Sequence, residues 1–185
     1  MELIIPVFTS YHPVFRNYGN IRDMEIERKF LVKNMPDISG IQPVYYERYF
    51  LKIEDGYQER IQRKGDRYEF ETKKLVPSIG NVSHHEKTRD QITEKEFERL
   101  KEGKENLGIM RDGYFLSKNP DISIKIYRGK YEGLVRAEVE FDSEKEARDY
   151  QPEPWMGEEI TNSPLGMDSR LLHLTTDEFR DLLGF

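Results

Sequence analysis

The chain of 185 residues contains no cysteine, one tryptophan and no long apolar run. Without cysteine it has no disulfides, thiolate nucleophiles or zinc–thiolate sites, which fits the reducing cytoplasm where we expect the protein. No stretch approaches the roughly 20 apolar residues of a transmembrane helix, so we expect no membrane partner. The apolar segment 3–8 follows Glu2 and is too short for the core of a signal peptide.

Charge, by contrast, is abundant. The chain has 35 acidic and 29 basic side chains, a formal net charge of -6, and nearly as many charged residues (35%) as hydrophobic ones (36%). An acidic total makes a nucleic-acid partner unexpected. The 12% aromatic content argues against disorder, because disordered chains are poor in aromatic residues. The length suits one domain, so the question is where so many charges are placed.

The chain divides into two unequal parts. Residues 1–23 show no periodicity and contain the turn-like run Asn17-Tyr18-Gly19-Asn20. We interpret them as a leader, and the sequence leaves open whether it is ordered on the rest of the protein. Residues 24–185 contain all the periodic segments, and we expect them to form one domain.

Alternation of side-chain character predicts β-strands through much of this domain. The run Lys64-Gly65-Asp66 separates two such segments and is typical of a hairpin turn. The predicted strands cover residues 25–32, 45–53, 58–63, 67–73, 122–127 and 135–141.

Three helices are predicted from their first turns. Thr93 with Glu96, Ser143 with Glu146, and Thr175 with Glu178 each have the spacing of a capping box. Many strands with a few helices between them indicate an α+β fold with a mostly antiparallel sheet.

Several predicted strands have one apolar face and one face that is almost wholly ionic or polar. Charged residues are disfavoured in strands, so the repetition needs an explanation. One is a solvated outer face. The other is a closed barrel whose ionic faces point inward, since an eight-stranded barrel can hold side chains or one small ligand. The four sets together favour the barrel: Glu25/Glu27/Lys29, Arg60/Gln62, Glu69/Glu71/Lys73 and Arg136/Glu138/Glu140.

The ionic faces also suggest a chemistry. Glu25 and Glu27 lie two residues apart, which places both carboxylates on one face of a strand, with Lys29 further along that face. Carboxylates bind hard cations such as Mg²⁺ or Mn²⁺, whereas Arg and Lys bind phosphate oxygens. A lumen with both kinds of side chain suits an anionic ligand bound together with a cation.

Six segments resemble, in order, the motifs of the CYTH superfamily, the triphosphate tunnel metalloenzymes. The first three are Glu25-Ile26-Glu27-Arg28-Lys29 (ExExK), Arg48-Tyr49-Phe50-Leu51 (QxYL), and Arg60-Ile61-Gln62-Arg63-Lys64-Gly65-Asp66 with Lys73 (RxRxxxD). The others are Arg111-Asp112-Gly113-Tyr114, Glu132-Gly133-Leu134 followed by Ala137-Glu138-Val139-Glu140-Phe141, and Trp155-Met156-Gly157-Glu158-Glu159-Ile160-Thr161.

The resemblance implies an eight-stranded antiparallel β-barrel with helices packed outside, which binds a small linear triphosphate and Mg²⁺ or Mn²⁺. It implies Lys29 and Tyr49 as catalytic residues. The implied metal-side carboxylates are Glu25, Glu27, Glu138, Glu140 and Glu159. The implied substrate-binding residues are Lys29, Arg60, Gln62, Lys73, Arg111, Lys125 and Arg136. A homodimer is compatible with the sequence, which does not determine the oligomeric state.

Some positions depart from the family pattern. Gln62 replaces the second arginine of the RxR pair, Gly113 stands where an arginine is often found, and Ser123 and Lys125 replace two acidic residues. Residues 84–91 lack the usual Arg/Glu alternation. We expect His84 and His85, which begin that segment, to have a loop or surface role, because adjacent histidines point to opposite faces of a strand.

The leading hypothesis is a metal-dependent hydrolase of inorganic tripolyphosphate or a small organic triphosphate. Two alternatives remain open. A class IV-like adenylate cyclase uses the same kind of tunnel to expel pyrophosphate, although no purine pocket is evident in the sequence. A non-catalytic triphosphate- or polyphosphate-binding module is favoured by the departures at Gly113, Ser123 and Lys125.

Overall fold

The computed structural model describes residues 21–77 and 82–184. Residues 1–20, most of the predicted leader, lie outside the described residues. The first strand, β1 (Ile21–Val32), begins three residues before the predicted domain boundary at residue 24, so residues 21–23 are part of this strand.

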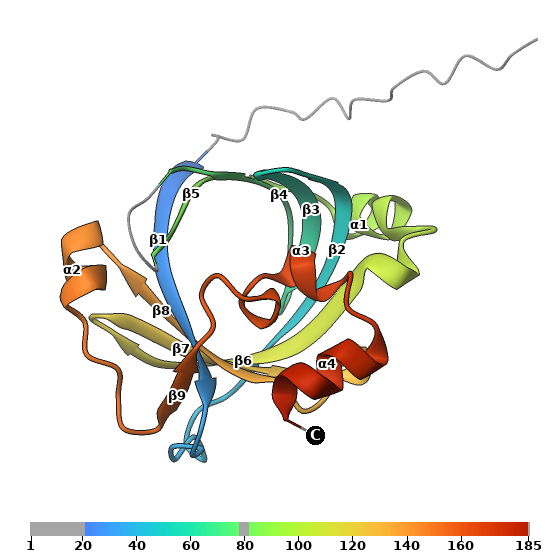
Figure 1. The fold of residues 1–185 in the computed structure, drawn as a ribbon. Coiled ribbons are helices and arrows are strands. Elements are labelled where there is room, and N and C mark those ends of the chain that lie inside the picture. Colours follow the sequence, from blue (N-terminus) through green and yellow to red (C-terminus); the bar gives the residue numbers. More distant parts are fainter. Residues whose placement is uncertain (1–20, 78–81, 185) are drawn as a thin grey trace, which may run out of the picture.

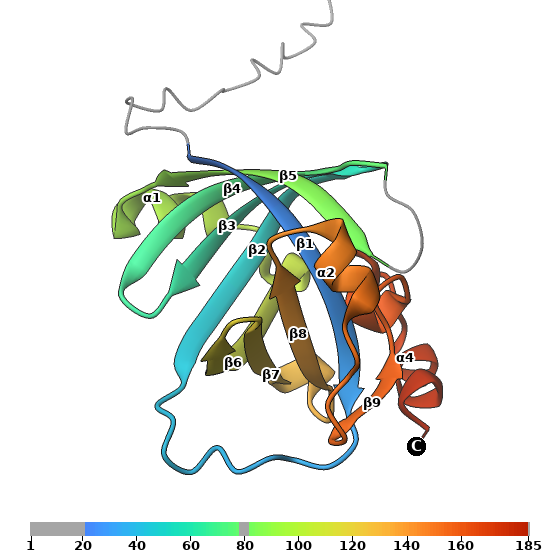
Figure 2. The ribbon, with the colours of Figure 1, turned by 90° about the vertical axis from the view of Figure 1, so that its left-hand side faces the viewer.

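Eight antiparallel strands form a closed ring (Figure 1). They follow the order β5-β4-β3-β2-β6-β7-β8-β1, and pairing of β1 with β5 closes the ring. Figure 2 shows β1 between β5 and β8, with which it pairs along different stretches. Besides β1, the strands are β2 (Val44–Glu54), β3 (Tyr57–Lys64), β4 (Arg67–Leu75), β5 (Ser83–Gln91), β6 (Gly108–Lys118), β7 (Asp121–Tyr127) and β8 (Val135–Phe141).

A ninth strand, β9 (Met156–Glu159), pairs with the end of β1 outside this ring. The predicted α+β fold with an eight-stranded antiparallel arrangement is therefore confirmed as a closed ring of eight strands with one additional short strand. The predicted hairpin is also confirmed: β3 and β4 pair in register, and Gly65 in the turn has a φ of 59° that favours glycine.

The apolar faces of the strands point outward and are covered. On β2, β3 and β4, Tyr49, Ile61 and Phe70 pack against Phe97 of α1 (Glu94–Lys101). A second cluster joins β1, β7 and β8 to Ala147 of α2 (Glu144–Asp149). Both helices begin at the predicted caps, where the Thr93 and Ser143 side chains accept hydrogen bonds from backbone N–H groups.

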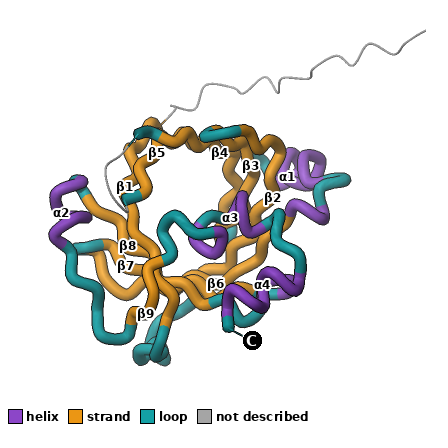
Figure 3. The backbone as a smooth tube through the Cα atoms, viewed as in Figure 1, coloured by secondary structure: helices purple, strands orange, loops and turns teal. Residues whose placement is uncertain are grey.

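The C-terminal segment lies across part of one opening of the ring (Figure 1). It contains a 3₁₀ turn (Pro164–Gly166), α3 (Asp168–Leu171) and α4 (Thr176–Leu183), which begins at the predicted cap Thr175. A third apolar cluster, which includes Leu165 and Leu171, attaches the segment to the strands. Figure 3 shows α1, α2 and α4 outside the ring and α3 over its opening. Two further 3₁₀ turns are Glu105–Leu107 and Gly129–Tyr131.

No helix among the described residues is both long enough and apolar enough to cross a membrane.

Candidate functional site

The interior of the ring is a polar cavity. All four ionic sets identified in the sequence line it, so the prediction that these faces point inward is confirmed. Among the described residues, eleven Lys and Arg side chains and seven Asp and Glu side chains line the cavity, an excess of four positive charges. Arg111 and Lys125, two of the expected substrate-binding residues, also line it.

Carboxylates of β1 form one side of the cavity. Glu27, which is 3% exposed, accepts hydrogen bonds from Lys29 Nζ at 2.8 Å and from Lys73 Nζ at 2.9 Å. Lys73 also forms an ion pair with Glu25, and Lys87 Nζ lies 3.3 Å from Glu25 Oε1. Burial alone raises the pKa of Glu25, but Lys73 and Lys87 hold it well below its usual value. Burial also raises the pKa of Glu27, but Lys29 and Lys73 hold it below its usual value, so both β1 carboxylates are charged at neutral pH.

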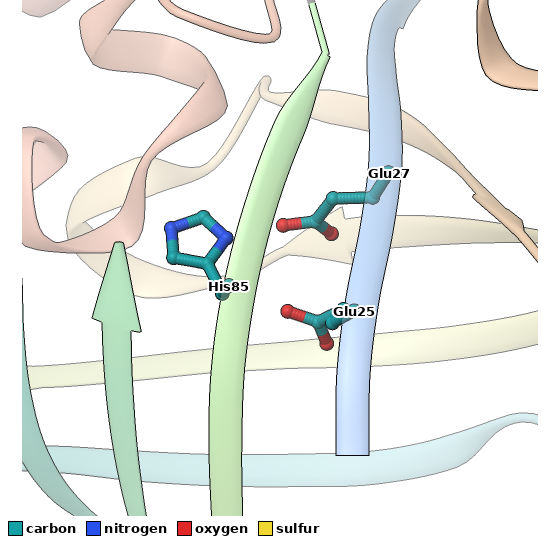
Figure 4. A group of neighbouring side chains, drawn as sticks. All are labelled: Glu25, Glu27 and His85. Carbon is teal, nitrogen blue, oxygen red and sulfur yellow. The ribbon is translucent and has the colours of Figure 1, made fainter. Parts of the chain in front are cut away.

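His85 of β5 faces these two carboxylates (Figure 4). Ligand atoms of Glu25, Glu27 and His85 all lie within 4.8 Å of one another. Burial, reinforced by Lys73, lowers the pKa of His85 to about 3, so its imidazole is neutral and able to ligate a cation. The expected loop or surface role is wrong for His85, which is 8% exposed, because β5 extends through this segment as part of the ring. His84 points away and its Nδ1 lies 3.2 Å from Glu144.

Glu138 and Glu140 of β8 lie in the same wall. Part of the Glu140 side chain reaches solvent, yet loss of hydration and the charges of Glu25, Glu27 and Glu138 raise its pKa to about 7. A divalent cation would relieve this concentration of negative charge. The donor set of carboxylate oxygens and one neutral imidazole therefore fits such an ion.

Glu71 of β4 lies close to Glu25, since Lys87 Nζ is 3.3 Å from both carboxylates; it is surrounded by basic side chains and is fully buried. Arg60 Nε donates a hydrogen bond to its Oε2 at 2.8 Å, and Lys87 Nζ lies 3.3 Å from its Oε1. Although burial raises the pKa of Glu71, the charges of Lys87, Arg60 and Arg48 hold it well below its usual value. This carboxylate fixes the positions of cations that would bind phosphate.

A cluster of three arginines, Arg48, Arg111 and Arg136, surrounds the carboxylate of Asp168 from α3. Burial raises the pKa of Asp168, but the three guanidiniums lower it well below its usual value. Arg48 also donates to Gln62 Oε1 from Nε at 3.0 Å.

Lys125 and Lys64 lie together near aromatic rings. Lys125 Nζ is 4.8 Å from the ring centroid of Phe115 and 4.9 Å from that of Tyr46, and Lys64 Nζ is 5.3 Å and 5.5 Å from the same two centroids. The carboxylate oxygen Oε2 of Glu138 lies 3.8 Å from Lys125 Nζ. Burial, opposed by Glu138 and reinforced by Arg111 and Lys64, lowers the pKa of Lys125 to about 8. An anion bound here would stabilise both ammonium groups.

Two predicted site residues lie outside the cavity. Tyr49 points to the outer face of β2, where its ring packs 6.1 Å from that of Phe97 and its hydroxyl donates to Glu47. Glu159 accepts a hydrogen bond from Arg28 Nη2 at 2.7 Å on the outer side of β1. The structure therefore corrects their placement: strand alternation turns Tyr49 away from the lumen, and Arg28 holds Glu159 outside it.

Several other residues that line the cavity were not predicted from the sequence. Arg48 could have been found from alternation along β2, because it shares a face with Tyr46. Nothing in the sequence singles out Asp168, which belongs to a helix of four residues. The other missed ionic residues are Lys64, Arg67, His85, Lys87 and Arg89.

Comparison with known proteins identifies relatives of this chain. No family model matches it. An inorganic triphosphatase of Nitrosomonas europaea is 34% identical over 140 residues, which cover 74% of this chain and 89% of the relative. Two crystal structures of the protein NE1496, one of them described as an inorganic triphosphatase, align with TM-scores of 0.59 and 0.60 and identities of 28% and 27%. They cover 80% and 82% of this chain and 97% and 95% of NE1496.

The curated relative, the closed antiparallel ring and its ionic interior agree with the six motif segments. The chain belongs to the CYTH superfamily of triphosphate tunnel metalloenzymes.

Proposed function

We propose that this protein hydrolyses a linear triphosphate inside the ring, with Mg²⁺ or Mn²⁺ as cofactor. One observation carries the proposal: the cavity has a carboxylate-rich side next to an excess of basic side chains, which suits a polyanion bound together with a cation. The name of the curated relative, an inorganic triphosphatase, makes inorganic tripolyphosphate the first substrate to test.

The basic side chains would bind and align the phosphate chain. Arg60, Lys73, Arg111, Lys125 and Arg136 come from five different strands, so their charges approach the lumen from several directions. Phosphoryl transfer depends mainly on positioning and on neutralisation of charge at the phosphate oxygens, which such a set supplies.

The carboxylate side would hold the cofactor. Glu25, Glu27, Glu138 and Glu140 are the proposed ligands, and His85 is a further candidate. When bound, a divalent cation polarises the phosphate and lowers the pKa of water.

Lys29 lies where these two sides meet, hydrogen-bonded to Glu27. Burial lowers its pKa, opposed by Glu27 and reinforced by Lys73 and Arg136. Its ammonium would orient the terminal phosphate for in-line attack by water. The outward placement of Tyr49 leaves Lys29 as the proposed catalytic side chain.

The test is a phosphate-release screen with tripolyphosphate, ATP and thiamine triphosphate, with and without Mg²⁺ or Mn²⁺. We expect metal-dependent release of phosphate from at least one substrate. Glu27→Gln and Lys29→Ala should each lower kcat by about a hundredfold or more, since each removes a charge at the reacting end.

Tyr49→Phe and Glu159→Gln are matched controls, because both residues lie outside the cavity, and they should retain activity within about threefold. Absence of phosphate release from all three substrates would reject the proposal. Formation of cyclic AMP and pyrophosphate from ATP would favour the cyclase, whereas binding without turnover would favour a binding module.

A further inference from the structure

The side chain of Asp168 enters the lumen from outside the strands of the ring. Its carboxylate accepts hydrogen bonds from Arg48 Nη1 at 2.6 Å, Tyr127 Oη at 2.8 Å, Arg136 Nη2 at 3.0 Å and Arg111 Nη1 at 3.1 Å. Asp168 is 7% exposed. Three guanidiniums and a hydroxyl from four strands therefore converge on one internal anion.

This donor set is also suited to a phosphoryl group. Guanidinium groups bind the oxygens of carboxylate and phosphate with the same fork of N–H donors. Arg111 and Arg136 are among the proposed phosphate-binding residues. The Asp168 carboxylate, which has a single negative charge, therefore occupies a site among the three arginines that could otherwise bind a phosphoryl group.

The segment that carries Asp168 is anchored to the ring. The neighbouring Ser169 accepts a hydrogen bond from Gln58 Nε2 of β3 at 2.8 Å. Arg136 Nη1 of β8 donates to the backbone oxygen of Leu165 at 3.1 Å. Leu165 and Leu171 are both almost fully buried in the apolar cluster beneath. The Asp168 carboxylate is therefore a fixed part of the cavity wall.

We propose that Asp168 sets the length of the phosphate chain that the ring accepts. Its carboxylate occupies the cluster of Arg48, Arg111 and Arg136 on the side of the cavity next to α3. A chain with one phosphoryl group more would bring further negative charge against a buried carboxylate already bound by the three arginines, and juxtaposed like charges are strongly unfavourable. The proposal rests on the proposed function in one respect, that the ring binds linear polyphosphates.

The test compares chain-length preference in Asp168→Asn, which keeps the shape of the side chain and removes its charge. Dissociation constants for pyrophosphate, tripolyphosphate and tetrapolyphosphate are measured by calorimetry in buffer with a chelator, so that no turnover occurs. We expect wild-type protein to bind tripolyphosphate about tenfold more tightly than tetrapolyphosphate. In Asp168→Asn this ratio should fall to about one or invert, because the arginines become available to the additional phosphate.

Asp177→Asn is the matched control: it is the same substitution at an exposed position in the first turn of α4. It should leave all three dissociation constants unchanged. Circular dichroism establishes that each variant is folded.

If Asp168→Asn does not fold, Asp168→Glu tests the effect of residue 168 on chain-length preference instead. This variant keeps the charge and extends it by one methylene group, so it should weaken tripolyphosphate binding more than pyrophosphate binding.

Three results would overturn the proposal. The first is an unchanged chain-length ratio in the folded Asp168 variants. The second is an equal gain in affinity for all three chains in Asp168→Asn, which would make the carboxylate a general competitor. The third is the absence of polyphosphate binding to any form of the protein. Failure of the wild-type protein to hydrolyse triphosphates would instead reject the proposed function, which the chelated binding series does not measure.

Discussion

At the scale of the residue, Arg48 and Gln62 explain one departure from the family pattern. The sequence suggests that Gln62 removes a positive charge from the lumen. In the structure the two residues are paired across β2 and β3, and Arg48 donates to the Gln62 side chain. Both line the cavity. The guanidinium missing from β3 is therefore supplied by the neighbouring strand.

This arrangement predicts that the two side chains can be exchanged. Arg48→Gln alone should raise KM for tripolyphosphate about tenfold or more, because it removes one charge from the lumen. The double variant Arg48→Gln with Gln62→Arg should recover most of that loss, since the charge returns to the adjacent position. Steady-state kinetics on the single and double variants measure the coupling. If the increases in KM caused by the two substitutions add up in the double variant, the two side chains are not interchangeable.

At the scale of the element, each strand separates two environments. Along β4, Glu71 and Lys73 face the lumen while Phe70 packs outward beneath α1. The alternation of apolar and ionic residues therefore predicted which side chains line the lumen, because the apolar face of each such strand packs outward and the ionic face points inward. The capping boxes at Thr93 and Thr175 were equally informative, because they depend on residues close in sequence.

The missed residues of β5 and α3, unlike Arg48, lacked such local signals. In β5 both faces are polar, since His84 and Glu86 alternate with His85 and Lys87, so nothing in the sequence shows which side faces inward. Asp168 enters the lumen only because a buried apolar cluster positions α3 over the opening. That contact joins distant parts of the chain and leaves no periodicity in the sequence. The fold and most of the residues that line the lumen were therefore predictable from the sequence. The contributions of β5 and α3 to the lumen were not.

The outer layer allows a prediction about stability. Phe97 of α1 is fully buried, and its ring lies 5.3 Å from that of Tyr68 and 6.1 Å from that of Tyr49. Phe97→Ala should lower the free energy of unfolding by about 3–5 kcal/mol, as expected for loss of a buried aromatic side chain. Urea unfolding measures this change.

Leu182→Ala in α4 is the control, because Leu182 is 44% exposed, and it should cost under about 1 kcal/mol. If Phe97→Ala is no more destabilising than Leu182→Ala, α1 does not contribute to the core as described. Variant protein that remains folded should keep its substrate affinity, since Phe97 does not line the cavity.

At the scale of the whole molecule, the charge of the surface and that of the interior have opposite signs. The chain carries a net charge of -6, whereas the lining of the cavity has eleven basic and seven acidic side chains. Concentrating basic groups in a confined space weakens the unliganded protein through their repulsion and desolvation. A polyanion that binds there should relieve this cost. Each basic group in the cavity therefore raises the affinity for the ligand and lowers the stability of the unliganded protein.

Lys125 allows a direct test of this trade-off between ligand affinity and stability. Its pKa in the folded protein is about 8, against about 10.4 in an unfolded chain, so below pH 8 folding has to keep an unfavourable buried charge. Lys125→Met removes the charge at similar length. In chelator-containing buffer at pH 7 this variant should be more stable than wild type by up to about 3 kcal/mol.

The dependence on pH has a definite sign. Between pH 8 and about 10.4 the unfolded chain binds more protons at this lysine than the folded protein does, so wild-type stability rises relative to Lys125→Met and the difference closes. Urea unfolding at pH 7, 8, 9 and 10 follows this change. Tripolyphosphate should also raise the melting temperature of the variant less than that of wild type, because the variant has one ammonium group fewer to bind it. A variant that is less stable at pH 7, or a stability difference that widens as pH rises, would show that Lys125 is not held as an unfavourable charge in the lumen.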